Sequence, residues 1–311
     1  MNGLKVDYDA DSWLLGTPAI GNIDDDIDLE IVIGGFSSSM RKIFAINADG
    51  SDVSGYPLEI GERMYVGVAL ADFNSNGKDD IVVGTDSDNI HLFYDDGSEA
   101  SGFPYQAGGN IRSAPAILDV DGQKVIFSGS DDNNLYAINS DGSLRFTVMA
   151  TNKIYNSPAF IEHNNSMYIF FSDDSGILYG IDTEGNILPG WPVDVGSSIE
   201  SSPSIADFNG DDIPEIVVSS STNDLNVGWS KNHPVSPVAP VASSVRTKLS
   251  MLVYDDPEKS HDSEKSLSAS KKPVPKIQLP RFPAGSNMPW MLFDSLVWFM
   301  ALIGQGVLSG R

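Results

Sequence analysis

Acidic side chains crowd the edges of three apolar stretches in this 311-residue sequence. In "ADFNGDDIPEIVVSS", residues 206–220, carboxylates and amides stand directly before an apolar run. Similar stretches are "TPAIGNIDDDIDLEIVIGG", which begins at Thr17, and "GVALADFNSNGKDDIVVGT", which begins at Gly67. Clustered or buried carboxylates are costly unless their charge is compensated. We therefore expect a bound cation, a solvated turn, or both at each of these places.

The charge of the chain is strongly negative and unevenly distributed. The formal net charge is −24; residues 1–228 carry 37 Asp and Glu against 9 Lys and Arg, whereas residues 229–311 carry 6 against 10. An acidic body of this kind repels phosphate backbones and attracts cations, so we expect no nucleic-acid partner. The 41% hydrophobic content is that of a globular protein, and the absence of cysteine excludes disulfides and thiolate metal sites.

The acidic stretches belong to an internal repeat with five copies, two of which have lost most of the acidic pattern. Equivalent positions, spaced by 50, 47, 43 and 45 residues, are Ala19, Ala69, Ala116, Ala159 and Ser204. A second marker, the glycine of "ADGS", "DDGS", "SDGS" and "TEGN", recurs at intervals of 47, 45 and 43 residues, at Gly50, Gly97, Gly142 and Gly185. Two markers in register indicate a true repeat, which is typical of propellers and solenoids.

Short β-branched and aromatic runs within each period predict strands rather than helices. Examples are 31–33, 81–83, 125–127 and 215–218. Asp-Gly after an apolar run favours a tight primed hairpin turn, and the prolines of "SGYP", "SGFP" and "PGWP" suit edge strands. Roughly four strands in about 45 residues is the size of one propeller blade. We therefore predict an all-β propeller of four-stranded blades over residues 1–228, with about four to five blades that start near residues 17, 67, 114, 157 and 202.

With the repeats aligned, the chain resembles the FG-GAP or VCBS repeat family over residues 13–228. Its members are the calcium-loop blades of β-propellers in integrin α-subunits and many secreted bacterial proteins. They carry a loop D-x-D-x-D-G-x-x-D/E between the first two strands of a blade, with calcium held at positions 1, 3, 5 and 9. The resemblance implies Ca²⁺ as cofactor and three ligand sets: Asn22, Asp24, Asp26 and Glu30; Asp72, Asn74, Asn76 and Asp80; Asp207, Asn209, Asp211 and Glu215.

The residue types agree with a hard cation, because calcium accepts six to eight carboxylate and amide oxygens in a tolerant geometry. Zinc would require histidine or cysteine, and magnesium a stricter octahedron. Position 6 usually needs glycine for a left-handed backbone; Gly77 meets this, Asp212 is tolerable and the β-branched Ile27 is poor. On this ground the first loop ranks as the weakest. The alternative is that all three loops are solvated acidic turns without metal.

The other two copies lack the loop pattern, and we expect them to bind no metal. The third copy keeps only Asp119 and Asp121, and the fourth offers Glu162, His163 and Asn164 without the spacing. No nucleophile elbow, P-loop, dinucleotide-binding or zinc-protease motif appears. His91 lies in a strand-like run, where we expect a packed or solvated ring. The acidic pairs 95–96, 131–132 and 173–174 could resemble glycosidase carboxylates, but each falls at a predicted turn, so no catalytic residue is assigned.

After residue 228 the periodicity stops. Residues 229–287 are rich in Pro, Ser and Lys and read as a disordered linker, and residues 288–311 form an apolar C-terminal segment. Within it, 291–308 is a marginal membrane span with basic residues on the propeller side. Basic flanks favour the cytoplasmic side, which would place a calcium-dependent propeller where calcium is scarce, so a frameshift, a mis-spliced reading or a fused fragment explains the segment better. The N-terminus shows no secretory signal, and the blades are fewer than the family's usual number. We therefore expect an incomplete propeller and an N-terminally incomplete sequence.

The functional expectation is a non-enzymatic, calcium-binding repeat module of a secreted or cell-surface protein. It would serve cell adhesion or bind a protein or glycan ligand on one propeller face, in an extracellular location. A first alternative is the propeller domain of a secreted carbohydrate-active enzyme or lectin. A weaker alternative is a quinone-dependent dehydrogenase propeller, because "LYAINSDGSLRF" resembles a blade ending of that family. Fold analogy alone does not choose among ligands.

Overall fold

The computed structural model describes residues 14–37, 41–163, 165–199, 201–207 and 214–221, and the backbone of 224–227 and 248–250. The chain divides into two compact units, Met1–Asp256 and Pro257–Arg311, and every described residue belongs to the first. These residues form no helix, so the described part offers none that could cross a membrane. Apart from Lys248–Ser250, the predicted linker 229–287 and the apolar segment 288–311, with its candidate span 291–308, lie outside the described residues.

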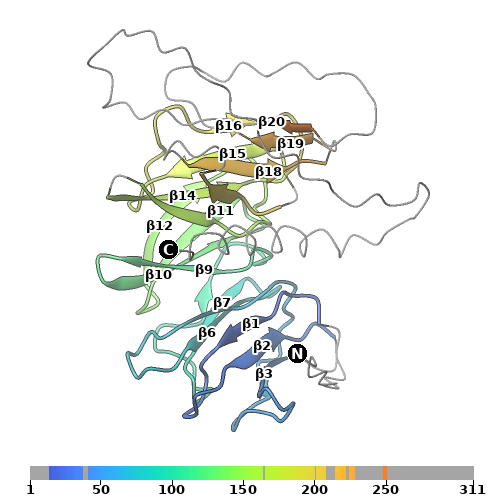
Figure 1. The fold of residues 1–311 in the computed structure, drawn as a ribbon, viewed down its shortest axis with the longest axis vertical. Helices are drawn as coiled ribbons and strands as arrows, with labels where there is room; N and C mark the ends of the chain where they lie inside the picture. Colours follow the sequence, from blue (N-terminus) through green and yellow to red (C-terminus); the bar gives the residue numbers. More distant parts are fainter. Residues whose placement is uncertain are drawn as a thin grey trace, which may run out of the picture. The chain divides into compact units, whose positions relative to one another are not determined.

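Twenty strands build five four-stranded sheets, which we call blades 1 to 5 in chain order (Figure 1). Their bounds are, for blade 1, β1 Ala19–Gly21, β2 Glu30–Gly34, β3 Lys42–Ile46 and β4 Leu58–Glu59; for blade 2, β5 Ala69–Ala71, β6 Asp80–Gly84, β7 Asn89–Phe93 and β8 Tyr105–Gln106; for blade 3, β9 Ala116–Val120, β10 Gln123–Gly129, β11 Asn134–Asn139 and β12 Leu144–Met149; for blade 4, β13 Ala159–His163, β14 Ser166–Ser172, β15 Ile177–Ile181 and β16 Val193–Asp194; for blade 5, β17 Ser204–Ala206, β18 Glu215–Ser219, β19 Asp224–Val227 and β20 Lys248–Ser250.

The repeat alignment predicted from the sequence is confirmed by the strand register. Each of the five equivalent residues opens the first strand of its sheet and pairs with an apolar residue of the second strand. The pairs are Ala19↔Val32, Ala69↔Val82, Ala116↔Phe127, Ala159↔Phe170 and Ser204↔Val217. Positions can therefore be compared between blades residue by residue.

Blade 5 differs from the others in its last strand. In blades 1 to 4 all four strands are antiparallel neighbours, whereas β20 pairs with β19 in parallel, with Leu225 opposite Leu249. A parallel neighbour cannot follow through a short hairpin and needs a longer connection. The fifth sheet thus takes a strand from beyond residue 228, the boundary that the sequence predicts for the repeats.

The recurring Asp-Gly turns differ from the expected primed type. Both primed turn types need positive φ at the first central residue, yet in the first of these turns Gly50 has positive φ, at 90°, and Asp49 before it does not. Gly50 N–H donates to the Asn47 carbonyl, and Asp49 accepts from Ser51 N–H at 2.9 Å, which favours an ordinary turn closed by a left-handed glycine. A primed pair occurs instead between β9 and β10, at Asp121 and Gly122, with φ of 54° and 79°.

The proline marker lies at the entry to the edge strand. Pro57, Pro104 and Pro192 directly precede β4, β8 and β16, and each follows a cis peptide bond. The aromatic residues before these prolines pack between blades. Tyr56 is buried in the cluster between blades 1 and 2, and Trp191 packs against the cluster that blades 4 and 5 share.

In the described residues, four apolar clusters lie between successive blades, and a smaller one, Ile33, Phe44 and Ile46, lies within blade 1. On β6, Ile81 and Val83 pack toward blade 1 with Val32, whereas Val82 packs toward blade 3 with Ile126. A sheet that buries both faces needs a neighbour on each side, which is the stacking of a β-propeller. Each blade therefore fixes the position of the next, including the loops at the start of its first hairpin.

Candidate cation sites at the first hairpins

Long loops join the first two strands in blades 1, 2 and 5, and each ends on a buried acid. The ninth loop position is the first residue of the second strand in all three blades. Glu30, Asp80 and Glu215 occupy it, each paired across the hairpin and each 0% exposed. Burying a carboxylate is expensive unless a partner compensates its charge. The fold therefore repeats the same electrostatic problem three times.

Blades 3 and 4 lack both the loop and the acid. The two residues between Val120 and Gln123 join β9 to β10, and two residues also join β13 to β14. The register positions that correspond to Glu30 are Val125, which is fully buried, and Tyr168. Loss of the loop thus coincides with replacement of the buried acid by an uncharged residue. This internal comparison indicates that the acid serves the loop and is not a requirement of the blade.

The first loop brings its three carboxylates together. Ligand oxygens of Asp24, Asp26 and Glu30 all lie within 4.8 Å of one another. Backbone N–H groups hold them in place: Ile23 donates to Glu30 Oε2 at 2.7 Å, and Asp26 donates to Asp24 Oδ1 at 2.9 Å. Burial raises the pKa of Glu30, the hydrogen bond from Ile23 lowers it, and the charges of Asp24 and Asp26 raise it again, leaving the pKa above its usual range.

Two oxygens of this loop have no donor. Asn22 Oδ1 and Glu30 Oε1 are buried and accept no hydrogen bond within the described part of the chain. A buried oxygen left unsatisfied costs about 1–3 kcal/mol, and the loss is larger for a charged group. These two oxygens belong to positions 1 and 9 of the loop. All four candidate ligands would bind a metal through a side-chain oxygen. The residues present therefore fit a hard divalent cation such as calcium.

The reason for which the sequence ranks the first loop as the weakest does not hold in the structure. That ranking assumed that Ile27 must adopt a left-handed backbone. Ile27 is absent from the positive-φ residues of the described chain, and its side chain is 95% exposed. The loop closes through successive bends without a left-handed residue, so the branched side chain meets no steric conflict.

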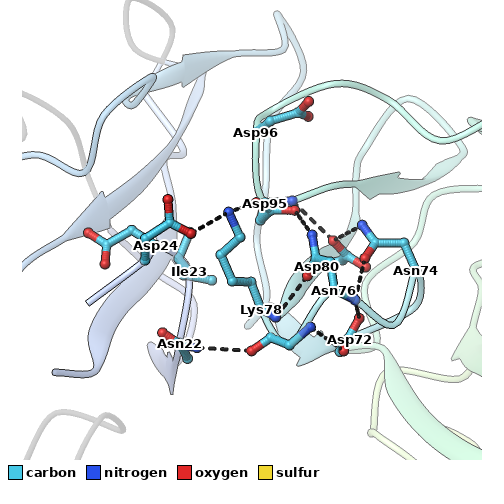
Figure 2. Close-up of polar contacts among 12 residues, drawn as sticks. Asn22, Ile23, Asp24, Asp72, Asn74, Asn76, Lys78, Asp80, Asp95 and Asp96 are labelled. Carbon is cyan, nitrogen blue, oxygen red and sulfur yellow. Dashed lines mark hydrogen bonds and ion pairs between the residues drawn. The ribbon is translucent and has the colours of Figure 1, made fainter. Parts of the chain in front are cut away.

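The second loop also gathers its four predicted residues, but donors already occupy their oxygens (Figure 2). Asp72 accepts from the N–H groups of Asn76 and Gly77 at 3.1 and 2.9 Å, and Asp80 accepts from Phe73 at 2.7 Å. Gly77 has the expected left-handed φ, at 88°. The side-chain oxygens of positions 3 and 5 each accept a loop N–H. This loop is therefore preorganised and largely satisfied by the chain itself.

Two residues of the second loop's surroundings were missed by sequence reasoning. Lys78 Nζ lies 2.6 Å from Asp95 Oδ2, and Asn76 Nδ2 donates to Asp95 Oδ1 at 2.7 Å. Burial alone would raise the pKa of Asp95, but the hydrogen bonds from Lys78 and Asn76 hold it below its usual range. Only the recurrence of acidic pairs at the turns pointed to Asp95, and its sequence gives no sign of the lysine that reaches it.

The third loop is only partly described. Asn209 and Asp211 lie outside the described residues, so their predicted role as ligands remains a prediction. Asp207 is exposed at the end of β17, and Glu215 opens β18. The burial of Glu215 repeats that of Glu30 and Asp80.

The remaining acidic pairs hold turns, as the sequence predicts. Asp96 accepts from Ser98 N–H at 2.9 Å, Asp132 from Asn134 N–H at 3.0 Å, and Asp173 from Ser175 N–H at 3.0 Å. Hydrogen bonds of this kind stabilise a turn by satisfying its free N–H groups. These carboxylates therefore have structural partners in the turns that contain them.

His91 has a packed position with more polar contacts than expected. Its ring stacks on Phe93 at 5.4 Å, and its two nitrogens face Glu99 at 2.6 Å and Glu62 at 3.2 Å. Glu62 in turn accepts from Asn89 at 2.9 Å. The two glutamates contact opposite ends of the ring, so the arrangement is a bridge between chain segments and not a single metal centre.

Comparison with known proteins supports the fold. No protein-family model matches the chain, and no curated protein matches it. The biofilm matrix protein Bap1 of V. cholerae is similar in structure, with 21% identity, a TM-score of 0.56, and coverage of 69% of this chain and 38% of Bap1. BamB from Moraxella catarrhalis shows 19% identity and a TM-score of 0.49, with coverage of 68% of this chain and 60% of BamB. BBS1N, solved in complex with ARL6DN, shows 15% identity and a TM-score of 0.47, with coverage of 69% of this chain and 64% of BBS1N. The chain thus spans less than two thirds of each of these proteins, and the likeness concerns the β-propeller fold.

Proposed function

We propose that the chain is a non-catalytic β-propeller module of the FG-GAP or VCBS type, whose first-hairpin loops bind calcium. One observation carries the proposal: Glu30 is fully buried with an oxygen that accepts no hydrogen bond, and ligand oxygens of Glu30, Asp24 and Asp26 lie within 4.8 Å of one another. A calcium ion supplies positive charge and oxygen coordination at such a place. Asp24 and Asp26 would bind it from the loop, and Glu30 from the first residue of β2.

The role of the loop in this proposal is structural. Glu30 opens the central strand β2 and pairs with Gly21 of β1, so a cation held by it fixes the first corner of the blade. A ligand that binds only the folded state adds RT ln(1 + [L]/Kd) to the free energy of unfolding. Calcium would thereby stabilise blade 1 and the interface that it forms with blade 2.

The extracellular part of the proposal rests on calcium supply. Calcium sites in extracellular modules have Kd of about 10⁻⁴–10⁻³ M and fill at the calcium concentrations found outside the cell. In the first loop, positions 25 to 29 are all exposed. We therefore propose a secreted or cell-surface module that presents ligand-binding loops on a calcium-stabilised frame. A Kd well below the micromolar range would contradict the extracellular assignment.

Thermal unfolding with and without calcium tests the proposal. At a calcium concentration of about 100 Kd the melting temperature should rise by about 5–10 °C over the EDTA-treated chain. Glu30→Gln should remove the first loop's share of that rise and one binding site in isothermal titration. The matched control is Glu162→Gln, in the first hairpin of blade 4, which should keep the full rise. An unaltered chain whose melt ignores calcium overturns the proposal.

A further inference from the structure

The first loop is held by the second blade through its first residue. Asn22 N–H donates to Asp79 Oδ2 at 3.1 Å, and Asp79 N–H donates back to the Asn22 carbonyl at 2.6 Å. The Asn22 side chain adds a third bond, because its Nδ2 donates to the Gly77 carbonyl at 3.0 Å (Figure 2). We call these three hydrogen bonds the Asn22–Asp79 clasp. Asp79 is position 8 of the second loop and is not among that loop's candidate ligands.

The clasp fixes the orientation of a candidate ligand. Because Nδ2 of Asn22 is committed to the Gly77 carbonyl, the amide cannot rotate without losing that bond. Its other end, Oδ1, is the buried oxygen without a donor. A ligand oxygen whose direction is set by an outer partner binds a metal more tightly than a free one. The partner here belongs to the neighbouring blade.

The local sequence of blade 1 fits the clasp. A Cβ added at Gly21 would lie 2.5 Å from Asp79 Oδ2 and 2.7 Å from Leu70 Cδ1, so only glycine lets Asp79 approach. Blades 2 and 5 carry Ala-Asp where blade 1 carries Gly21-Asn22. An aspartate at position 22 would offer no donor and would set a carboxylate against the Gly77 carbonyl. The clasp thus accounts for an amide at a position where the other loops have a carboxylate.

A second contact between the loops is weaker. Lys78 Nζ lies 3.2 Å from Asp25 Oδ1, but the Asp25 side chain is 96% exposed. Solvent and salt screen such a pair, and exposed pairs of this kind contribute little. Asn22 and Asp79 are both half-buried, and their bonds include two to the backbone. The clasp, and not the ion pair, therefore connects the two loops.

We propose that Asp79 is a positioning residue for the cation of the first loop, so that blade 2 completes the site of blade 1. This assignment rests on the proposed calcium binding. Because binding couplings are reciprocal, a cation in the first loop would in turn tighten the interface between blades 1 and 2. The first loop would lose affinity whenever that interface opens, even with all four of its own ligands intact.

Calcium titration of the full chain by calorimetry tests the assignment. Asp79→Ala removes the side-chain acceptor of Asn22 N–H, which holds the backbone that carries the ligand amide, and should weaken binding at the first loop by about tenfold, the lower end of the effect of losing an outer contact. Asp79→Asn keeps an oxygen acceptor for Asn22 N–H and should restore most of the affinity. Asp28→Ala is the matched control: it removes an exposed, non-ligand carboxylate of the first loop and should weaken binding less than about threefold. In a Glu30→Gln background, Asp79→Ala should have no further effect on the remaining sites.

Asn22→Asp gives a test with an opposite sign. If ligand charge alone set the affinity, the added carboxylate would tighten binding. The clasp predicts weaker binding, because the bond to the Gly77 carbonyl is replaced by repulsion. Melting in EDTA shows whether each variant still folds, and the fold-change in Kd is read from those that do. The assignment alone is overturned if Asp79→Ala binds calcium at the first loop as tightly as Asp28→Ala does. It is also overturned if Asn22→Asp binds calcium more tightly than the unaltered chain. An unaltered chain that binds no calcium overturns the assignment and the proposed function together.

Discussion

At the scale of single residues, hydrogen bonding distinguishes acids that occupy the same loop position. The spacing predicts Glu30 and Asp80 as equivalent ligands, and both are fully buried. Both oxygens of Asp80 accept hydrogen bonds from the chain, from Phe73 and Asp95, whereas one oxygen of Glu30 accepts none. Without a cation, the first loop therefore lowers the stability of the fold more than the second loop does, because an unsatisfied buried oxygen costs free energy and a hydrogen-bonded one does not. We expect calcium dependence to arise mainly from the first loop.

The lysine of the second loop leads to a residue-scale prediction. Lys78→Met keeps the aliphatic stem but leaves Asp95, 9% exposed, without its ammonium partner. Because Lys78 itself is 24% exposed, solvent compensates part of the lost pair, and we expect a moderate fall in the free energy of unfolding. Urea unfolding in EDTA measures it, with Lys124→Met on β10 as the control, which should change stability by less than about 0.5 kcal/mol. Equal costs for the two variants would refute the role of Lys78.

At the scale of elements, blades 2 to 4 share a contact that no motif announces. In each of these blades, the third residue of the third strand has a ring with a polar atom. This atom contacts the segment that connects the preceding blade to the first strand of this one. The contacts are His91 to Glu62 at 3.2 Å, Gly108 N–H to Tyr136 Oη at 3.0 Å and Thr151 N–H to Tyr179 Oη at 2.9 Å. In blade 1 the corresponding residue is Phe44, which has no polar head. Burial and the hydrogen bond from Tyr136 to Asp132 raise the pKa of Tyr136 to about 12, so this phenol stays a donor at neutral pH.

Asp173 gives the element-scale prediction, since it joins the β14–β15 turn to the segment before blade 4. It accepts from Thr151 N–H and Oγ1, and from Ser175 and Ile177 N–H. Burial would raise its pKa, but these bonds hold it below the ordinary value of 3.8. Its contribution is therefore complete above that value and is lost as the pH falls through the lower folded-state pKa. Asp173→Asn should cost about 2–3 kcal/mol at pH 7 and less at pH 3.

Urea midpoints at the two pH values measure this difference. The exposed neighbour Asp174, whose carboxylate accepts a hydrogen bond from Ser198 Oγ, supplies the control Asp174→Asn. That variant should change stability little at either pH. A cost of Asp173→Asn that is the same at pH 3 and pH 7 would show that ionisation of Asp173 does not contribute.

At the scale of the whole molecule, the repeat made the fold predictable and the details less so. Five equivalent positions with alternating apolar runs were enough to predict strands, blade order and blade starts. The predicted type of the turn at Asn47–Ser51 was wrong, because the Asp49 side chain accepts a hydrogen bond from Ser51 N–H and stabilises a different turn. The clasp at Asn22 and the pair of Lys78 with Asp95 join different blades or different strands. Such contacts depend on the three-dimensional placement of loops, which spacing along one chain does not encode.

Equivalent positions in different blades allow a last prediction about stacking. Ile31 of β2 corresponds by register to Ile81 of β6, and the partners across the hairpin are Ile20 and Leu70. Ile81 is fully buried against blade 1, as are its counterparts in blades 3 and 4 against the blades that precede them, whereas Ile31 is 41% exposed and Ile20 66%. Removing the same side-chain atoms at the two positions should therefore lower the free energy of unfolding by different amounts.

Ile81→Ala should lower the free energy of unfolding by about 2–5 kcal/mol, and Ile31→Ala by less than about 1 kcal/mol. Urea denaturation in calcium compares them with equal side-chain chemistry, so only burial differs. Equal costs would mean that the outer face of blade 1 is covered in solution as completely as the faces between the blades.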